Sequence, residues 1–268
     1  MSVTIKNAQI KNAHIGPTVA TRGLVACWNV VSTHSYPRTG SKLYDLIKNK
    51  NNGDMVNMNS SNFSDDVGGS LILDGTNEYI NIPYHASNLS LDVGTGSFSI
   101  SMWVAPSEFA VGTVSEVARQ KSSSSFGVGA SAGWSIGINS HGVFGWGLAD
   151  MGLQDETESF TMCSNCTPSL NVPWDEWHHI TMSYDVISKN CFAYIDAIQH
   201  VSLVAPSSFG SLSNTRPLEI GGRVDYGQIY NPFKGSISSL YFYKSALNTE
   251  EIEKNYNATK SNYQVNDW

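Results

Sequence analysis

The stretch that decides the fold is Gly69-Ser-Leu-Ile-Leu-Asp-Gly-Thr-Asn-Glu-Tyr-Ile-Asn-Ile82. It is strand-like, and it has a strand-like counterpart far along the chain. The counterpart is Phe233-Lys-Gly-Ser-Ile-Ser-Ser-Leu-Tyr-Phe-Tyr-Lys-Ser-Ala-Leu-Asn-Thr-Glu-Glu-Ile252. Together the two segments bracket most of the chain. This separation predicts one closed β domain whose ends meet in space rather than a string of small modules.

Short alternating segments fill the region between and around this pair. Ser97-Phe-Ser-Ile-Ser-Met-Trp-Val104 alternates strictly, so every second side chain faces the same side of a strand. Turn-forming residues separate many such segments, which predicts an all-β fold, an antiparallel two-sheet jelly-roll sandwich. One helix is predicted near the C-terminus, capped by Asn248 or Thr249. The other predicted strands are 23–29, 134–138, 143–148, 177–184, 191–196, 217–222 and 235–243.

Composition narrows the class of protein. The chain has 268 residues, 41% of them hydrophobic and 15% charged, which suits one large β domain with many turns. Its net charge of −7 argues against nucleic-acid binding, because phosphate contacts need a basic patch. No apolar run approaches the ~20 residues of a membrane span, so we expect no membrane insertion. The segment 1–12 has no apolar core of a signal peptide, so we expect a protein that is not exported that way.

The first 22 residues differ from the rest. Ile5-Lys-Asn-Ala-Gln9 and Ile10-Lys-Asn-Ala-His14 form a near repeat, and a further isoleucine follows at Ile15. The period of five suits neither one face of a strand nor a helix. We therefore predict two parts, an extended N-terminal assembly arm (1–22) and a sandwich domain (23–268). The alternative for the arm is a disordered leader.

Several motifs occur in an order that resembles a known family. They include Leu71-Ile-Leu-Asp-Gly-Thr-Asn-Glu-Tyr79, Phe98-Ser-Ile-Ser-Met-Trp-Val104, Trp177-His-His-Ile180 and Ala246-Leu-Asn-Thr-Glu-Glu-Ile252. From about residue 23 to 260 the chain resembles the laminin-G-like, concanavalin A-like lectin/glucanase domain. Its ending, 250–260, is similar to versions of this domain in structural proteins of tailed bacteriophages.

The resemblance implies that an enzyme of this superfamily would carry a pair of catalytic carboxylates. Its glucan-cutting members place paired carboxylates on alternate positions of one strand, so that both enter one cleft. No Glu-x-Asp-x-Glu pattern is present here, and Asp196 stands alone in its strand. The acidic stretch Asp155-Glu-Thr-Glu158 is typical of a solvated loop. We therefore expect a protein that is not an enzyme.

Two features of the sequence are candidates for a metal site. Cys163-Ser-Asn-Cys166 has a metal-like spacing, but zinc needs four ligands, and the neighbouring His178 and His179 should point to opposite faces of a strand. No other cofactor is expected, but the resemblance implies a structural calcium ion, for which Asp74 is the candidate ligand; its alternative role is a turn residue. Two positions that resemble acids of the family are Asn29 and Ser238 here, which weakens the calcium prediction.

Aromatic residues supply the candidate glycan-binding site. Sugars stack their apolar faces on Trp or Tyr rings, and polar side chains bind the hydroxyls. Trp134 and Trp146 lie in the predicted hairpin, with core residues as their alternative role. Tyr226 and Tyr230 lie in the loop-like Asp225-Tyr-Gly-Gln-Ile-Tyr-Asn231, where an exposed functional role is favoured.

The leading functional hypothesis combines these observations. The resemblance implies a non-enzymatic bacteriophage protein located in the virion, a head decoration, fibre or tail component. Its partners would be other virion proteins and further copies of itself, a trimer by family analogy, and its lectin-like domain would attach to host glycans or stabilise the particle. The alternatives are a glycoside hydrolase or lyase of the same fold, and a free cellular carbohydrate-binding module.

Overall fold

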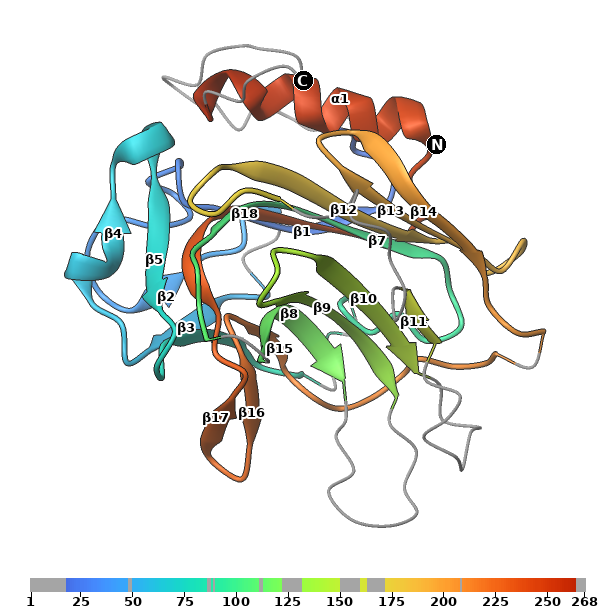
Figure 1. The fold of residues 1–268 in the computed structure, drawn as a ribbon, viewed down its shortest axis with the longest axis horizontal. Coiled ribbons are helices and arrows are strands. Elements are labelled where there is room, and N and C mark those ends of the chain that lie inside the picture. The colour runs from blue at the N-terminus through green and yellow to red at the C-terminus, as the bar shows by residue number, and fades with distance from the viewer. Residues whose placement is uncertain are drawn as a thin grey trace.

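The described residues of the protein form an antiparallel sandwich of two eight-stranded sheets, with one α-helix packed on the outside (Figure 1). The computed structural model describes residues 18–47, 50–85, 88, 90–110, 113–121, 132–149, 160–162, 172–207 and 209–263. The predicted all-β fold with a short C-terminal helix is confirmed. No helix among these residues is long and apolar enough to cross a membrane.

The first sheet, sheet A, has the order β14-β13-β12-β7-β18-β5-β4, and β1 also pairs with β18. The long strand β18 lies near the end of the chain. The first half of one of its edges pairs with β5, and the second half of that edge pairs with β1, which lies near the start of the chain. Its strands are β1 Leu24–Asn29, β4 Phe63–Ser64, β5 Ser70–Asp74, β7 Phe98–Pro106, β12 His178–Tyr184, β13 Asn190–Ile195, β14 Ile198–Val204 and β18 Lys234–Tyr243.

The second sheet, sheet B, has the order β11-β10-β9-β8-β15-β6-β3-β2. A separate two-stranded hairpin, β16 Arg223–Asp225 and β17 Gln228–Tyr230, follows β15 directly in the chain. The strands of sheet B are β2 Lys42–Leu43, β3 Gly53–Val56, β6 Tyr79–Ile82, β8 Val114–Lys121, β9 Gly133–Asn139, β10 Phe144–Ala149, β11 Phe160–Met162 and β15 Leu218–Ile220.

The opening stretch of sequence serves both sheets. Its first half forms β5 of sheet A and its second half forms β6 of sheet B, with a turn between them. Leu71, Leu73, Ile80 and Ile82 all point into the core between the sheets. This one segment therefore links the two layers of the sandwich.

The core is built from the inward side chains of both sheets. Phe98 of β7 lies 6.4 Å from Trp134 of β9 and 6.5 Å from Phe242 of β18, measured between ring centroids. The alternation predicted for β7 is confirmed: its even-numbered side chains enter this core, while Trp103 packs in a separate cluster with Tyr256 and Tyr263.

Helix α1, Thr249–Thr259, covers the outer face of sheet A (Figure 1). Asn248 caps it, as predicted, in a capping box in which its side chain and that of Glu251 each accept a backbone N–H. Ile252 packs against the sheet, and Trp103 Nε1 donates to Thr259 Oγ1 at 2.7 Å. These apolar and polar contacts fix the helix on sheet A.

Residues just before the predicted boundary at residue 23 contact helix α1. Ala20 is buried, and its N–H donates to Asn255 Oδ1 in α1 at 2.7 Å. Arg22 Nε donates to Glu251 Oε1 at 2.7 Å. Residues 20–22 therefore pack as part of the sandwich domain, and the isoleucines predicted to form the arm, Ile5, Ile10 and Ile15, lie outside the described residues.

Candidate functional site

The β16–β17 hairpin presents two tyrosines at the surface. Its turn is Asp225-Tyr226-Gly227-Gln228, and both central residues have positive φ, 52° for Tyr226 and 77° for Gly227. Hairpins with two-residue loops favour such turns because their twist matches that of the strands. Tyr226 is 87% exposed and Tyr230 is 39% exposed. Sequence reasoning selected both residues, and the structure brings them together on one hairpin.

An arginine lies over one of these rings. The guanidinium carbon of Arg223 is 4.9 Å from the centroid of the Tyr230 ring. Arg223 Nε lies 2.9 Å from Asp225 Oδ2, so the same guanidinium also forms an ion pair within its own strand. The surface of the hairpin thus combines aromatic faces with a positive charge.

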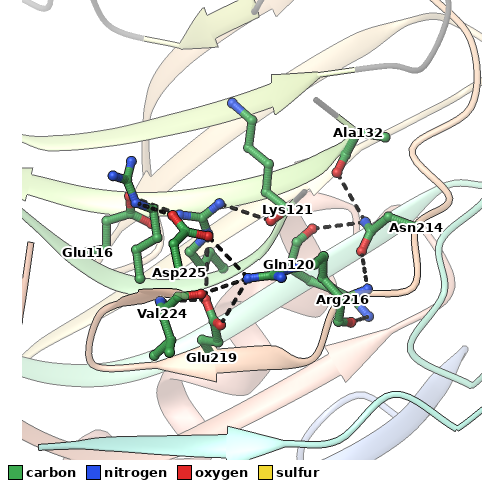
Figure 2. Close-up of polar contacts among 11 residues, drawn as sticks. Glu116, Gln120, Lys121, Ala132, Asn214, Arg216, Glu219, Val224 and Asp225 are labelled. Atoms are coloured by element: carbon green, nitrogen blue, oxygen red, sulfur yellow. Dashed lines mark hydrogen bonds and ion pairs between the residues drawn. The ribbon is translucent and has the colours of Figure 1, made fainter. Parts of the chain in front are cut away.

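A set of paired charges lies between this hairpin and sheet B, and Figure 2 shows its contacts. Glu219 alternates with the core residues Leu218 and Ile220, so its side chain points to the outer face of the sheet. Arg119 is its register partner on β8. We call this set the charged layer, and it comprises Glu116, Arg119, Arg216, Glu219, Arg223 and Asp225.

The contacts of the charged layer link the sheet to the hairpin. Arg216 Nη2 lies 3.2 Å from Asp225 Oδ1 and donates to the Val224 carbonyl at 2.6 Å. The Val224 N–H in turn donates to Glu219 Oε2 at 3.2 Å (Figure 2). The first strand of the hairpin is therefore fixed to sheet B through both its backbone and its side chains.

Asn214 holds Arg216 in place. Its amide nitrogen donates to the carbonyls of Gln120 at 3.2 Å and Ala132 at 3.1 Å, and its Oδ1 accepts the Arg216 N–H at 2.9 Å (Figure 2). Because Asn214 bonds to two separate segments, it sets the direction from which Arg216 reaches Asp225.

Burial changes the protonation of this layer. Desolvation raises the pKa of Glu219 to about 7, against the opposing effects of the Val224 N–H and of Arg119 and Arg216. Burial also lowers the pKa of Arg119, although Glu116 and Glu219 oppose that shift. Near neutral pH the three arginines therefore face fewer than three full negative charges.

Several polar atoms of the charged layer are buried without a hydrogen bond. Among the described residues these include Glu116 Oε2, Arg119 Nε and Arg216 Nε. Arg119 Nε is still 3.8 Å from Glu219 Oε2, which is an ion-pair distance rather than a hydrogen bond. A buried polar group without a partner lowers stability unless water or a ligand binds it.

Two of the predicted stacking residues lie elsewhere. Trp134 and Trp146 are 0% and 1% exposed and belong to the main core. The prediction that their rings stack on a sugar is wrong, because both side chains point to the inner face of sheet B. Both tryptophans are instead core residues, which was their alternative role.

The candidate metal residues each make a hydrogen bond with the backbone. Asp74 Oδ1 accepts the Thr76 N–H at 2.7 Å, which is the contact of a turn residue. Asn29 Oδ1 accepts the Val31 N–H, and Ser238 Oγ donates to the Gly69 carbonyl. No group of three or more His, Cys, Asp or Glu side chains that could hold a metal ion is found in the part of the chain that the structure describes.

The two histidines among the zinc candidates are separated, as predicted. His178 Nδ1 is 2.8 Å from Asp196 Oδ2, whereas His179 Nε2 is 2.7 Å from Ser101 Oγ, and their register partners are neighbours on β7. The two histidines thus lie on opposite faces of β12. Cys163 and Cys166 lie outside the described residues.

Sequence reasoning did not select the charged layer. A signal existed for Glu219, since it is a carboxylate between two apolar residues of a predicted strand. Its partners come from β8, from the segment before β15 and from β16. Only the pairing of β15 with β8 shows that Arg119 and Glu219 meet.

Comparison with solved structures shows the same fold in several binding domains. The binding domain of Paraclostridial Mosquitocidal Protein 1 has a TM-score of 0.64 and 18% identity, covering 87% of this chain and 52% of that chain. Domain 4 of AbnA, a GH43 extracellular arabinanase from Geobacillus stearothermophilus, was solved in complex with arabinotriose. It has a TM-score of 0.58 and 16% identity, and the match covers 87% of this chain and 98% of that chain. The Ruminococcus gnavus IT-sialidase CBM40 bound to α2,3 sialyllactose has a TM-score of 0.53 and 14% identity, covering 69% and 94%.

These identities show a common fold and no more. The chain spans about half the length of the mosquitocidal binding domain. No curated protein matches the sequence.

The sequence profile of one family, described as the Concanavalin A-like lectin/glucanases superfamily, matches residues 74–253. That match covers well over half of the chain, and it agrees with the two-sheet sandwich. The chain therefore belongs to the laminin-G-like branch of the concanavalin A-like lectin/glucanase superfamily.

Proposed function

We propose that this protein is a non-catalytic carbohydrate-binding domain that binds glycans on the β16–β17 hairpin. The observation that carries the proposal is Tyr226, a large aromatic residue that is 87% exposed in a left-handed turn position. Glycine, asparagine and aspartate are favoured there, and a bulky side chain is strained. A strained and exposed aromatic residue at a rigid turn is better explained by binding than by stability.

The fold neighbours support this class of function. Two of them are carbohydrate-binding parts of larger enzymes, solved with arabinotriose and with sialyllactose. Tyr226 and Tyr230 offer two aromatic faces for such sugars, and the ion pairs of the charged layer hold the hairpin in position. A preorganised surface loses less entropy on binding.

The carboxylates of the site are poorly placed for catalysis. Glu219 and Asp225 are 3% and 5% exposed, and both are engaged by arginines. A general acid or nucleophile must touch the glycosidic oxygen or the anomeric carbon of the sugar. These two groups would reach a sugar only if the hairpin moved away. A binding role is therefore favoured over a hydrolase of the same fold.

The test is a glycan array followed by calorimetry with the best ligand. Tyr226→Asn creates an Asn-Gly turn that suits the left-handed geometry, so we expect an unchanged or higher melting temperature. Loss of the stacking ring, worth on the order of 1 kcal/mol, should lower affinity about fivefold. Ile187→Asn is the matched control, because Ile187 is 90% exposed in the turn between β12 and β13.

Three outcomes contradict the proposal. The first is no binding to any glycan, and the second is an equal loss of affinity in the Ile187→Asn control. The third is release of reducing ends from a bound glycan that Glu219→Gln abolishes, which would make the protein an enzyme.

The virion location is kept as a separate proposal. It rests on the resemblance of residues 250–260 to bacteriophage proteins. In the structure this segment is helix α1, and its cap and its contacts with Tyr243 and Trp103 account for Asn248, Asn255 and Thr259. The same residues would suit a cellular protein of this fold. Mass spectrometry of purified particles from the host of origin tests the location.

A further inference from the structure

We propose that the glycan bound at the hairpin carries a negative charge, and that Arg223 is the residue that recognises it. This inference rests on the proposed glycan-binding function and adds the chemical class of the ligand. It requires a carboxylate, sulfate or phosphate group on the sugar, placed beside a ring that stacks on Tyr226 or Tyr230.

The position of Arg223 leaves part of its guanidinium free to bind a ligand. Its Nε lies 2.9 Å from Asp225 Oδ2, and its guanidinium carbon lies over the Tyr230 ring. Among the described residues, no hydrogen bond engages either terminal Nη, and a third of the side chain is exposed. The cation–π contact and the ion pair together hold the guanidinium at the surface of the hairpin. A planar guanidinium whose two terminal nitrogens are free fits a carboxylate, sulfate or phosphate group in a bidentate manner.

The surroundings of Arg223 favour an anion despite the overall negative charge of the chain. The charged layer holds Arg119, Arg216 and Arg223 against Glu116, Glu219 and Asp225. Burial raises the pKa of Glu219 to about 7, so one of the three carboxyl groups is partly neutral at neutral pH. The local balance is then positive, although the whole chain carries −7. An anionic ligand would restore neutrality.

A purely structural role for Arg223 is less well supported. The hairpin is already held by the backbone bonds of β16 with β17, by the Val224 N–H on Glu219 and by Arg216 on Asp225. Asp225 therefore keeps one arginine partner when Arg223 is replaced. A residue that only held the hairpin would not need a side chain that keeps a third of its surface in solvent.

The experiment compares matched charged and neutral probes. α2,3-sialyllactose is paired with lactose, and polygalacturonate is paired with its fully methyl-esterified form, which has the same backbone without charge. Calorimetry at low salt should show at least tenfold tighter binding to the charged member of one pair. The ratio should fall as sodium chloride is raised, because screening weakens an exposed charge–charge contact.

Variants connect this ratio to one residue. Arg223→Gln should reduce the charged-to-neutral ratio to about one while binding of the neutral member persists, and Arg223→Lys should keep part of the ratio. Arg38→Gln is the control, because the Arg38 guanidinium also lies over a ring, that of Phe63 at 4.7 Å, but outside the hairpin. It should keep the wild-type ratio. Melting temperatures verify that each variant is folded.

The outcomes separate this inference from the proposed function. Equal affinity for charged and neutral probes overturns the charge requirement and leaves glycan binding intact. A high ratio that survives in Arg223→Gln overturns the role of Arg223. If no glycan binds at all, charged or neutral, both the proposed function and this inference fail. If Arg223→Gln does not fold, the salt dependence of the wild-type protein still tests the charge requirement, and the charged-to-neutral ratio of Arg223→Lys tests the role of Arg223.

Discussion

At the scale of single residues, aromatic side chains divide into two groups that composition does not distinguish. Trp134 and Trp146 fill the core, whereas Tyr226 is almost wholly in solvent. Trp and Tyr suit both environments, because each joins a large apolar ring to one polar atom. The position of the residue in the strand or turn decides which role it takes.

The burial of Trp146 leads to a prediction on stability. Trp146→Ala should leave a large cavity beside Phe144, whose ring centroid is 6.1 Å away, and lower the free energy of unfolding by about 3–5 kcal/mol. Urea titration followed by circular dichroism measures this change. At temperatures where the variant is folded, glycan affinity should match the wild type. A selective loss of affinity with unchanged stability would restore Trp146 as a binding residue.

At the scale of elements, helix α1 joins the start and the end of the domain. The segment 18–22 lies on this helix through the Ala20 N–H bond to Asn255 and the Arg22 pair with Glu251. Asn255 also donates to the Tyr243 hydroxyl on β18, so it connects three elements.

Two truncations test where the domain begins. Deleting residues 1–17 should leave the melting temperature unchanged. Deleting residues 1–22 should lower stability by about 1–3 kcal/mol, chiefly because the buried Asn255 loses its partner. The exposed Arg22–Glu251 pair should add little. Differential scanning calorimetry measures both effects, and equal melting temperatures for the two truncated chains would contradict this assignment.

The shorter truncation also tests the assembly arm. That role of Ile5, Ile10 and Ile15 stays a prediction, since it falls on residues outside those described. If the arm mediates assembly, light scattering should show that the chain lacking residues 1–17 has lost its oligomeric state while remaining folded.

At the scale of the whole molecule, the charged layer couples stability to pH. The pKa of Glu219 rises from an ordinary value of 4.5 to about 7 on folding, because burial disfavours the charged form. Between these two values the folded protein holds one more proton than the unfolded chain. The contribution of Glu219 to stability is therefore fully present below pH 4.5 and is lost as pH rises through about 7.

A comparison of variants isolates this effect from the other carboxyl groups. Glu219→Gln keeps an oxygen for the Val224 N–H but cannot ionise. Its stability relative to wild type should increase from pH 5 to pH 8, measured by urea unfolding at each pH. Glu250→Gln, at an exposed position in the first turn of α1, is the control and should show no such trend. A flat difference for Glu219→Gln would mean that Glu219 stays ionised in the folded protein.

The sequence by itself determined the class of fold and several local structures. The alternation of β7, the hairpin of β9 and β10 and the cap of α1 all depend on neighbours within a few residues, so they can be deduced from the pattern. The exposed turn at Tyr226 and Gly227 is also a local structure that can be deduced from neighbouring residues. Local geometry needs only local sequence.

Only the tertiary structure decided which residues form the site. Alternation shows which side chains share a face of a strand, but strand order decides which face turns inward, and this placed Trp146 in the core. Arg119 and Glu219 are 100 positions apart, and they meet because β15 pairs with β8 and places them in register. The raised pKa of Glu219 follows from the burial that this pairing creates. Long-range pairing, which no single stretch of sequence encodes, therefore assembled the charged layer beneath the hairpin.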